Sequence, residues 1–147
     1  MTADYKLKRF VDAQDEGRSY ESALGEILRG HKSTHWIWYV FPQIAGLGRS
    51  DRSVCFAISS LDEARAYLAH PLLGARLREI TAAANAHAPH SAREIFGIDD
   101  VKFHSSVTLF SLADPGAEVF REALDVFFDA KPDAATLKIL EGQPDSA

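Results

Sequence analysis

Cysteine is nearly absent from this chain of 147 residues: Cys55 is the only one, so no internal disulfide can form. The sequence also lacks an apolar run of about 20 residues, the length that a helix needs to cross a bilayer. Its first nine residues contain no apolar segment of the kind found in signal peptides. We therefore expect a cytoplasmic protein that is not embedded in a membrane.

Basic residues are in the minority, since 16 Lys and Arg stand against 21 Asp and Glu, for a formal net charge of −5. General binding to nucleic acids depends on clustered Lys and Arg side chains that neutralise phosphates. The acidic balance therefore argues against such binding, although it leaves room for one small basic pocket.

The composition is otherwise that of an ordinary globular protein, with 46% hydrophobic and 25% charged residues. The length suits one domain, and neither a repeat nor an internal linker divides the chain. We therefore expect a single globular helical domain over residues 1–147, with a frayed polar end at residues 141–147.

Helix signals recur along the whole chain. Apolar residues at helical spacing predict helices over residues 5–14, 20–28, 34–41, 61–69, 71–86, 92–96, 117–128 and 134–140. N-terminal caps are expected at Ser19, Ser33, Ser60, Ser91, Asp114 and Asp133. Segments 53–58 and 107–112 are too short for periodicity to separate helix from strand, and we predict both as helical. The predicted fold class is all-α, an array of about seven to eight short helices with at most one minor strand pair.

The segment 31–53 is the densest in aromatic and polar side chains. Four aromatic residues fall within six positions: Trp36, Trp38, Tyr39 and Phe41. If the segment is helical, Trp36, Tyr39 and Gln43 share one face, while His35 and Trp38 share another. Aromatic faces with polar groups at their edges are typical of a pocket for a flat ligand. The same spacing is also typical of a core helix, and both interpretations stay open.

A turn rich in glycine, arginine and serine follows, with the sequence G-L-G-R-S-D-R-S over residues 46–53. Its glycines let backbone amides turn inward, and Arg49 and Ser50 offer a guanidinium and a hydroxyl just before an expected helix. These are the parts of an anion site, but the pattern is neither a Walker loop nor the dinucleotide-binding fingerprint. A surface turn with solvated arginines is the alternative.

Charged and hydroxyl side chains gather again at D-D-V-K-F-H-S-S-V-T, residues 99–108. Lys102, Ser105 and Ser106 fall on one face of an expected helix that Asp99 or Asp100 could cap. A Ser–Lys pair can form a nucleophile and its base, or it can hold a phosphate group. The polar first turn of a helix is the simpler alternative.

Two histidine pairs, His31 with His35 and His87 with His90, have spacings that occur in metal sites. Neither pair has a nearby carboxylate or cysteine to complete a ligand set. We therefore expect no metal site and no cofactor.

Four stretches carry a resemblance to known proteins: R-F-V-D-A-Q, G-H-K-S-T-H-W-I-W-Y-V-F-P-Q-I-A-G-L-G-R-S, Y-L-A-H-P-L-L-G-A-R-L and D-D-V-K-F-H-S-S-V-T-L-F. Over residues 5–128 the chain resembles the bacterial family of unknown function numbered eighteen-ten. The resemblance implies a mainly helical fold and no established activity. Some members carry the name calpastatin, a disordered inhibitor that a globular composition does not match. More distantly, the family is similar to helical proteins that cleave N-glycosidic bonds of ADP-ribosyl groups and riboflavin precursors, a fold analogy that transfers no catalytic position.

We therefore predict binding of a phosphorylated, ring-bearing small molecule, such as a nucleotide or an ADP-ribose derivative, with hydrolysis of its N-glycosidic bond as the candidate reaction. The expected ligand-binding residues are Lys32, Trp36, Trp38, Tyr39, Gln43, Arg49, Ser50, Lys102, Ser105 and Ser106. Glu26 and His35 are the expected catalytic acid or base, because glycoside chemistry needs a carboxylate and Glu26 is nearest to the aromatic block. The alternative is a non-enzymatic binding or interaction module. The pocket requires residues 31–53 and 100–108 to meet in space.

Overall fold

The computed structural model describes residues 5–143 and shows a mainly α-helical protein, which confirms the predicted fold class. The helical elements in this range are α1 Lys8–Asp15, η1 Glu16–Arg18, α2 Ser19–Leu28, α3 Ile37–Val40, α4 Asp51–Cys55, α5 Leu61–Ala69, α6 Pro71–Asn85, α7 Ala92–Phe96, η2 Gly97–Asp99, α8 Asp100–Ala113, α9 Glu118–Phe128 and α10 Ala134–Glu141. Between residues 5 and 143 there is no strand, and the expected strand pair is reduced to one isolated parallel bridge, between Ile44 and Ile58. No helix of this range is long and apolar enough to cross a membrane.

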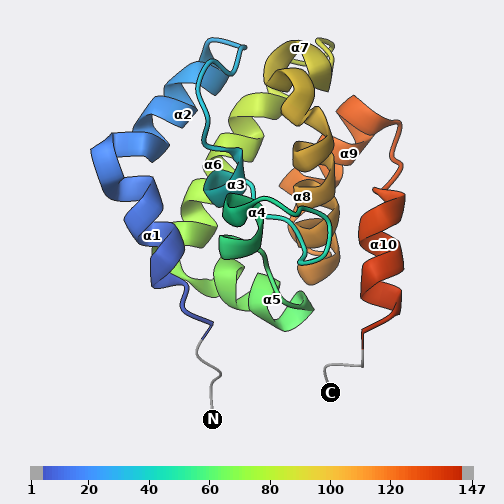
Figure 1. Cartoon of the computed structure of the whole chain (residues 1–147). Coiled ribbons are helices and arrows are strands. Elements are labelled where there is room, and N and C mark those ends of the chain that lie inside the picture. Colours follow the sequence, from blue (N-terminus) through green and yellow to red (C-terminus); the bar gives the residue numbers. More distant parts are fainter. Residues whose placement is uncertain (1–4, 144–147) are drawn as a thin grey trace.

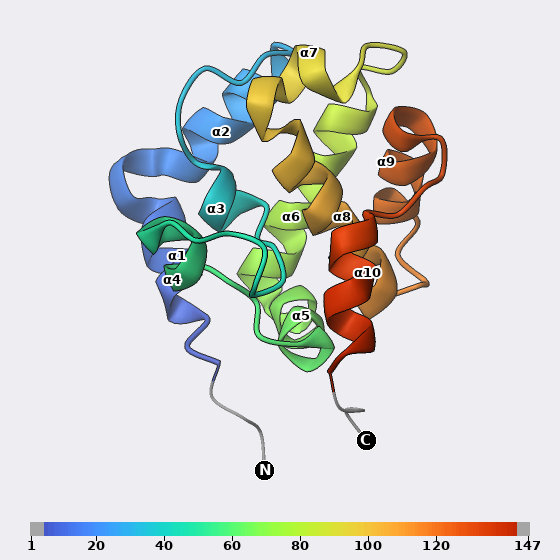
Figure 2. The same cartoon turned by 45° about the vertical axis from the view of Figure 1, so that its right-hand side comes forward.

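Helices α6 and α8 run through the middle of the molecule (Figure 1). Helices α1 and α2 lie on one side of them, and α9 and α10 lie on the other, as the turned view in Figure 2 also shows. Helix α8 contacts α5, α7, α9 and α10, and α6 contacts α2, α5 and α9. Residues 105–110 of α8 are all buried, which explains why the segment 107–112 carries no helical periodicity in its sequence.

Aromatic rings fill the core beneath α3. Phe41 meets Phe96 and Phe103 edge to face, with ring centroids 5.6 and 5.2 Å apart. Phe96 and Phe103 stack at 4.1 Å. Trp36 is 1% exposed and lies 6.2 Å from Phe41, centroid to centroid. Part of the aromatic block is therefore core, as one of the two interpretations of the sequence predicts.

Several predicted caps are present. Ser91 and Glu94 form a complete capping box at α7, Pro71 is the first residue of α6, and the Asp133 side chain accepts a hydrogen bond from the Thr136 amide at the start of α10. At α5 only half of the expected box forms. Ser60 accepts from the Glu63 amide, but the Glu63 carboxylate accepts from the amide and hydroxyl of Ser59 instead.

Other boundaries differ from the prediction for local reasons. Ser19 lies inside α2, after Arg18, and its hydroxyl is 2.5 Å from the Tyr39 hydroxyl rather than on a backbone amide. Asp114 does not cap α9, because its carboxylate accepts from the Gly116 amide and closes a turn before Glu118. The predicted helix over 53–58 is α4, which begins two residues earlier and ends at Cys55.

The helix expected over residues 34–41 is shortened to α3, which spans only Ile37–Val40. Ser33 does not cap it. The amides of Ser33 and Thr34 donate instead to Glu26 Oε1, at 2.7 and 2.9 Å. A side chain of α2 thus takes the donors that a helical turn or cap would have used, and residues 31–36 form a loop.

The expected frayed end, residues 141–147, lies partly outside the described range. Its first residue, Glu141, still belongs to α10, and Gln143 Nε2 donates to the Ser59 carbonyl at 2.9 Å. The part of this segment that the structure describes is therefore docked against the start of α5.

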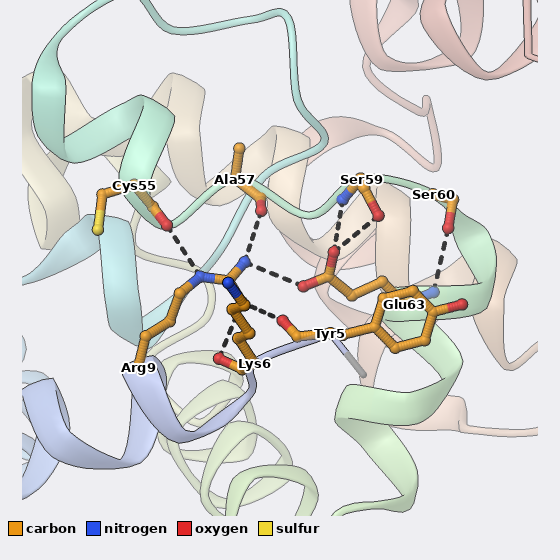
Figure 3. A network of polar contacts seen from close by, with 8 residues as sticks. All are labelled: Tyr5, Lys6, Arg9, Cys55, Ala57, Ser59, Ser60 and Glu63. Atoms are coloured by element: carbon orange, nitrogen blue, oxygen red, sulfur yellow. Dashed lines mark hydrogen bonds and ion pairs between the residues drawn. The ribbon is translucent and has the colours of Figure 1, made fainter. Parts of the chain in front are cut away.

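Arg9 binds the chain at the end of α4 and directly after it (Figure 3). Its guanidinium donates to the carbonyls of Cys55 and Ala57, at 2.8 and 2.9 Å, and to Glu63 Oε2 at 3.0 Å. Glu63, which is 3% exposed, in turn accepts from the Ser59 amide at 2.8 Å. This network joins α1, the end of α4 and α5, and it holds the segment whose Ile58 amide donates to the Gln43 carbonyl at 2.8 Å.

Candidate functional site

A pocket of about 460 Å³ lies where the two polar segments of the sequence meet. Residues 47–50 and Ser53 form one wall, the first turns of α8 form a second, and the beginning of α10 forms a third. Its volume falls in the range of small-molecule sites, about 300–1,000 Å³. The spatial meeting of residues 31–53 and 100–108 that the pocket prediction required is therefore present.

The loop wall is tightly built. Ser50 Oγ accepts from the Ser53 amide at 3.1 Å and donates to Ser53 Oγ at 2.9 Å. A Cβ atom added to Gly48 would lie 2.4 Å from Ser53 Cβ, so only glycine fits at this position. Helix α4 is only five residues long and Ser50 already caps it, so the capacity of this wall for an anion rests on its side chains.

Arg49 is the cation of the loop wall. Its side chain is exposed and lines the pocket. Within residues 5–143, no hydrogen bond, ion pair or cation–π contact holds its guanidinium. The other cation that lines the pocket, Lys102, has an ion-pair partner, so Arg49 is the cation whose hydrogen-bond donors are free to bind a ligand.

The α8 wall contributes Lys102 and Ser105. Lys102 Nζ lies 3.5 Å from Asp99 Oδ1, and Asp99 Oδ2 also pairs with Lys32 Nζ at 2.8 Å. Asp99 therefore shares its negative charge between two lysines, only one of which, Lys102, lines the pocket. Ser105 is 2% exposed and donates to the Val101 carbonyl at 3.0 Å.

The third wall was missed in the sequence analysis as part of a site. It consists of Asp133, which was predicted only as a cap, and Ala135. The Asp133 amide donates to Thr108 Oγ1 at 2.9 Å, and His104 Nε2 donates to the Lys131 carbonyl at 2.8 Å. Two α8 side chains thus hold the turn before α10 in place. A signal in the sequence existed, since Asp133 follows a Lys-Pro pair at the start of a helix, but nothing in it linked this turn to residue 49.

Trp38 supplies the aromatic surface. It is partly buried, it lines the pocket with Gln43, and the Arg52 guanidinium lies 5.1 Å from its ring centroid. A partly exposed indole beside cationic groups can stack on a flat ring.

The structure thus brings six of the predicted ligand-binding residues to one pocket: Trp38, Gln43, Arg49, Ser50, Lys102 and Ser105. Four others lie elsewhere: Lys32, Trp36, Tyr39 and Ser106. Lys32 is 6% exposed and ion-paired, and Ser106 is fully buried in α8. Tyr39, 8% exposed, lines a separate hollow of about 390 Å³ beside Arg52.

The two predicted catalytic residues do not line the pocket either. His35 is exposed on the loop before α3. Glu26 is 4% exposed, and its carboxylate accepts hydrogen bonds from the Ser33 and Thr34 amides, the Thr34 hydroxyl and the Trp36 indole. Burial alone would raise the pKa of Glu26, but the hydrogen bonds from Thr34, Ser33 and Trp36 outweigh it and lower the pKa to about 2. Glu26 is therefore an ionised anchor of the loop 31–36.

The described residues contain no preformed metal centre. No cluster of three or more His, Cys, Asp or Glu side chains in the described part of the chain has the geometry to hold a metal ion. The chemistry of the pocket is that of two cations, one carboxylate, several hydroxyls and an indole.

Comparisons place the chain among proteins without an assigned function. Residues 4–140 match a family model described as a protein of unknown function (DUF1810). The fold is similar to the crystal structure of the conserved hypothetical protein Rv1873 from Mycobacterium tuberculosis, with a TM-score of 0.90 and 44% sequence identity. That similarity covers 95% of this chain and 99% of the other. No curated protein matches the sequence.

Proposed function

This chain belongs to the DUF1810 family of unknown function, and we propose that it binds a phosphorylated small molecule with a flat ring, such as a nucleotide, in the pocket between residues 47–53, α8 and α10. The observation that carries the proposal is the presence of an unpaired guanidinium, Arg49, in the same pocket as a partly exposed indole, Trp38. The guanidinium can hold a phosphate group, and the indole can stack on a flat ring.

The charge distribution supports an anionic ligand. The chain as a whole carries a formal charge of −5, yet the pocket holds Arg49 and Lys102 against a single carboxylate, Asp133. Lys102 is only loosely neutralised, because Asp99 lies closer to Lys32 than to it. The Ser53 hydroxyl, which accepts from Ser50, adds a neutral donor. An anion entering this pocket meets a guanidinium fork, an ammonium group and a hydroxyl, the groups that usually recognise phosphate.

Binding has more support than cleavage of an N-glycosidic bond. Such cleavage needs a carboxylate at the bond that breaks. Glu26, the carboxylate predicted for that role, lies outside the pocket lining, and its two oxygens are occupied by four donors. The carboxylate in the pocket, Asp133, has one oxygen committed to the cap of α10. A partner surface built from the aromatic block also has little support, since Trp36, Tyr39 and Phe41 are buried.

Calorimetric titration of the purified protein with AMP, adenosine and inorganic phosphate tests the proposal. We expect AMP to bind more tightly than either fragment, because it alone offers both a phosphate and a ring. Arg49→Ala should weaken AMP binding at least about ten-fold, as expected for the loss of a charged hydrogen bond.

Arg29→Ala is the matched control. Arg29 is also exposed, and its side chain makes no hydrogen bond or ion pair with residues 5–143, but it follows α2 and does not line the pocket. This variant should bind AMP like the wild type. Absence of AMP and phosphate binding at millimolar concentration, or equal losses in the two arginine variants, would refute the proposal.

A further inference from the structure

We propose that Asp133 is the specificity-determining residue of this pocket and that it selects phosphorylated ligands whose phosphate is attached to a sugar with free hydroxyl groups. The inference rests on the proposed function, and it adds the chemical class of the group next to the phosphate. Asp133 would receive the sugar hydroxyls while Arg49 and Lys102 hold the phosphate.

The two carboxylate oxygens of Asp133 have different surroundings. Oδ2 accepts from the Thr136 amide and hydroxyl, at 3.0 and 2.7 Å, and lies 3.3 Å from Ser105 Oγ, whose single proton it shares with the Val101 carbonyl. Oδ1 has no hydrogen-bond partner among residues 5–143, and it is not buried. One oxygen is therefore committed to the protein, and the other is accessible and unoccupied by any donor of the described chain.

The cap on α10 does not explain the free oxygen or the charge. Serine, asparagine and aspartate cap helices about equally well, and a cap uses one acceptor atom. At Asp133 that atom is Oδ2. No cation of the described residues lies within ion-pair distance of this carboxylate, although Arg49 and Lys102 line the same pocket. A lone carboxylate in a pocket for anions repels the phosphate unless the ligand brings it a donor.

The carboxylate is also held rigidly, as a recognition group should be. Its backbone amide donates a hydrogen bond to Thr108 Oγ1 at 2.9 Å, and the Lys131 carbonyl two residues earlier accepts one from His104 Nε2 at 2.8 Å. The His104 ring stacks on Phe128 at 3.8 Å, which ties the same turn to the end of α9. The direction of the free oxygen is therefore set by α8 and α9 before a ligand arrives.

The chemistry follows from these placements. A sugar hydroxyl that donates to an ionised carboxylate makes a charge-assisted hydrogen bond, about twice as strong as a neutral one. Inorganic phosphate can offer Asp133 only a proton of the charged phosphate itself, and that charge is repelled by the carboxylate, whereas a sugar places neutral hydroxyl donors beside it. The pocket should therefore bind ribose 5-phosphate in preference to inorganic phosphate, even without a base on Trp38.

Asp133→Asn separates recognition from helix capping, because asparagine keeps one acceptor oxygen for the Thr136 amide, while the charge is lost and an NH2 donor replaces the free acceptor oxygen. Affinities for ribose 5-phosphate and inorganic phosphate are measured by calorimetry for wild type and variant. We expect the wild type to prefer ribose 5-phosphate about ten-fold or more. In the variant the preference should disappear, with phosphate affinity unchanged or higher and ribose 5-phosphate affinity lower.

Asp125→Asn is the control, since it removes the same charge from an exposed position on α9 outside this pocket. It should leave the ratio of the two affinities unchanged, and a thermal melt of each variant checks that both fold. If wild type prefers phosphate, or if Asp133→Asn changes both affinities by the same factor, Asp133 acts only through long-range charge and the inference is overturned. If neither compound binds the wild type, the proposed function fails first and the inference fails with it.

Discussion

The indole N–H of Trp36 donates to Glu26 Oε1 at 2.9 Å, and this contact joins the loop 31–36 to α2 inside the protein. Both side chains are nearly inaccessible, at 1% and 4% exposure. Because the Glu26 carboxylate also holds Thr34 through its amide and hydroxyl, one buried charge organises the chain that leads into α3. A carboxylate that was predicted to be catalytic therefore has a role in stability.

Replacement of Glu26 by glutamine should lower the free energy of unfolding by about 3 kcal/mol at neutral pH. This value follows from the pKa of Glu26, which is about 2 in the folded protein against an ordinary value of 4.5. Because the folded-state pKa is the lower one, the stabilisation is fully present above about pH 4.5 and is lost as pH falls towards 2. Urea unfolding of wild type and Glu26→Gln at pH 7, 5 and 3 should show two curves that converge at low pH.

Glu21→Gln, an exposed position on the same helix, should leave stability almost unchanged at every pH. A constant difference between wild type and Glu26→Gln from pH 7 to pH 3 would contradict the role assigned to the Glu26 charge.

Features that local sequence signals determine, such as helix starts, were predicted well. Features that depend on residues distant in the sequence were not. Ser91 with Glu94, and Pro71 after His70, carry their start signals within four positions, and both helices begin where predicted. The prediction of a helix over residues 34–41 was wrong at its start, because the amides there donate to Glu26, a residue of another helix. No periodicity in residues 34–41 reports that competition.

The site was predictable in part for the same reason. Arg49 and Lys102 were found by residue type, but that they face one pocket is a property of packing. Trp36 immediately precedes the four-residue helix α3 and Trp38 lies within it, so spacing alone could not decide which of the two is core. Asp133 was missed because a cap explained it fully at the level of sequence.

The ion pair of Arg9 with Glu63 should be worth more than any exposed pair in the protein. Arg9→Ala leaves the buried Glu63 carboxylate without its cation and frees the carbonyls of Cys55 and Ala57. We expect a loss of about 3 kcal/mol in urea unfolding, the size typical of a broken buried pair. Hydrogen exchange at residues 55–58 should accelerate at the same time.

Lys8→Ala is the comparison for this prediction. The Lys8–Asp12 pair is exposed on both sides, and its removal should change stability by less than about 0.5 kcal/mol. Equal effects of Arg9→Ala and Lys8→Ala would mean that the network in Figure 3 does not stabilise the fold.

The stability of the fold should depend on the ion pair between Lys32 and Asp99. Lys32 is 6% exposed, and Asp99→Asn removes its carboxylate partner at 2.8 Å. We expect a loss of about 3 kcal/mol, since an unpaired buried charge is strongly unfavourable. The second substitution Lys32→Met, on top of Asp99→Asn, should recover most of this loss because a methionine side chain can pack over the Trp36 ring that Lys32 now covers. No recovery in the double variant would show that the charge is not the cause.

Gly48→Ala should damage the pocket more than the fold. The added methyl group would lie 2.4 Å from Ser53 Cβ, so the loop wall must shift. Because Gly48 belongs to a surface loop, we expect a thermal midpoint within a few degrees of wild type and a loss of AMP affinity of at least about ten-fold, as for one lost charged hydrogen bond. Gly116→Ala, where the nearest atom is at an ordinary 3.4 Å, should alter neither quantity. Unchanged AMP affinity in Gly48→Ala would separate this loop from the binding site.

The two tryptophans should respond differently to an ionic quencher. Trp36 is 1% exposed, whereas Trp38 is partly exposed beside the Arg52 guanidinium, which attracts iodide. We expect iodide to quench only part of the fluorescence, with a downward-curving quenching plot, and Trp38→Phe to abolish the quenchable part. AMP should protect the same fraction if it stacks on Trp38, and adenosine should protect it less because it lacks the phosphate. Quenching that survives in Trp38→Phe would place the accessible indole at residue 36 and would contradict both the fold around Glu26 and the pocket assigned to Trp38.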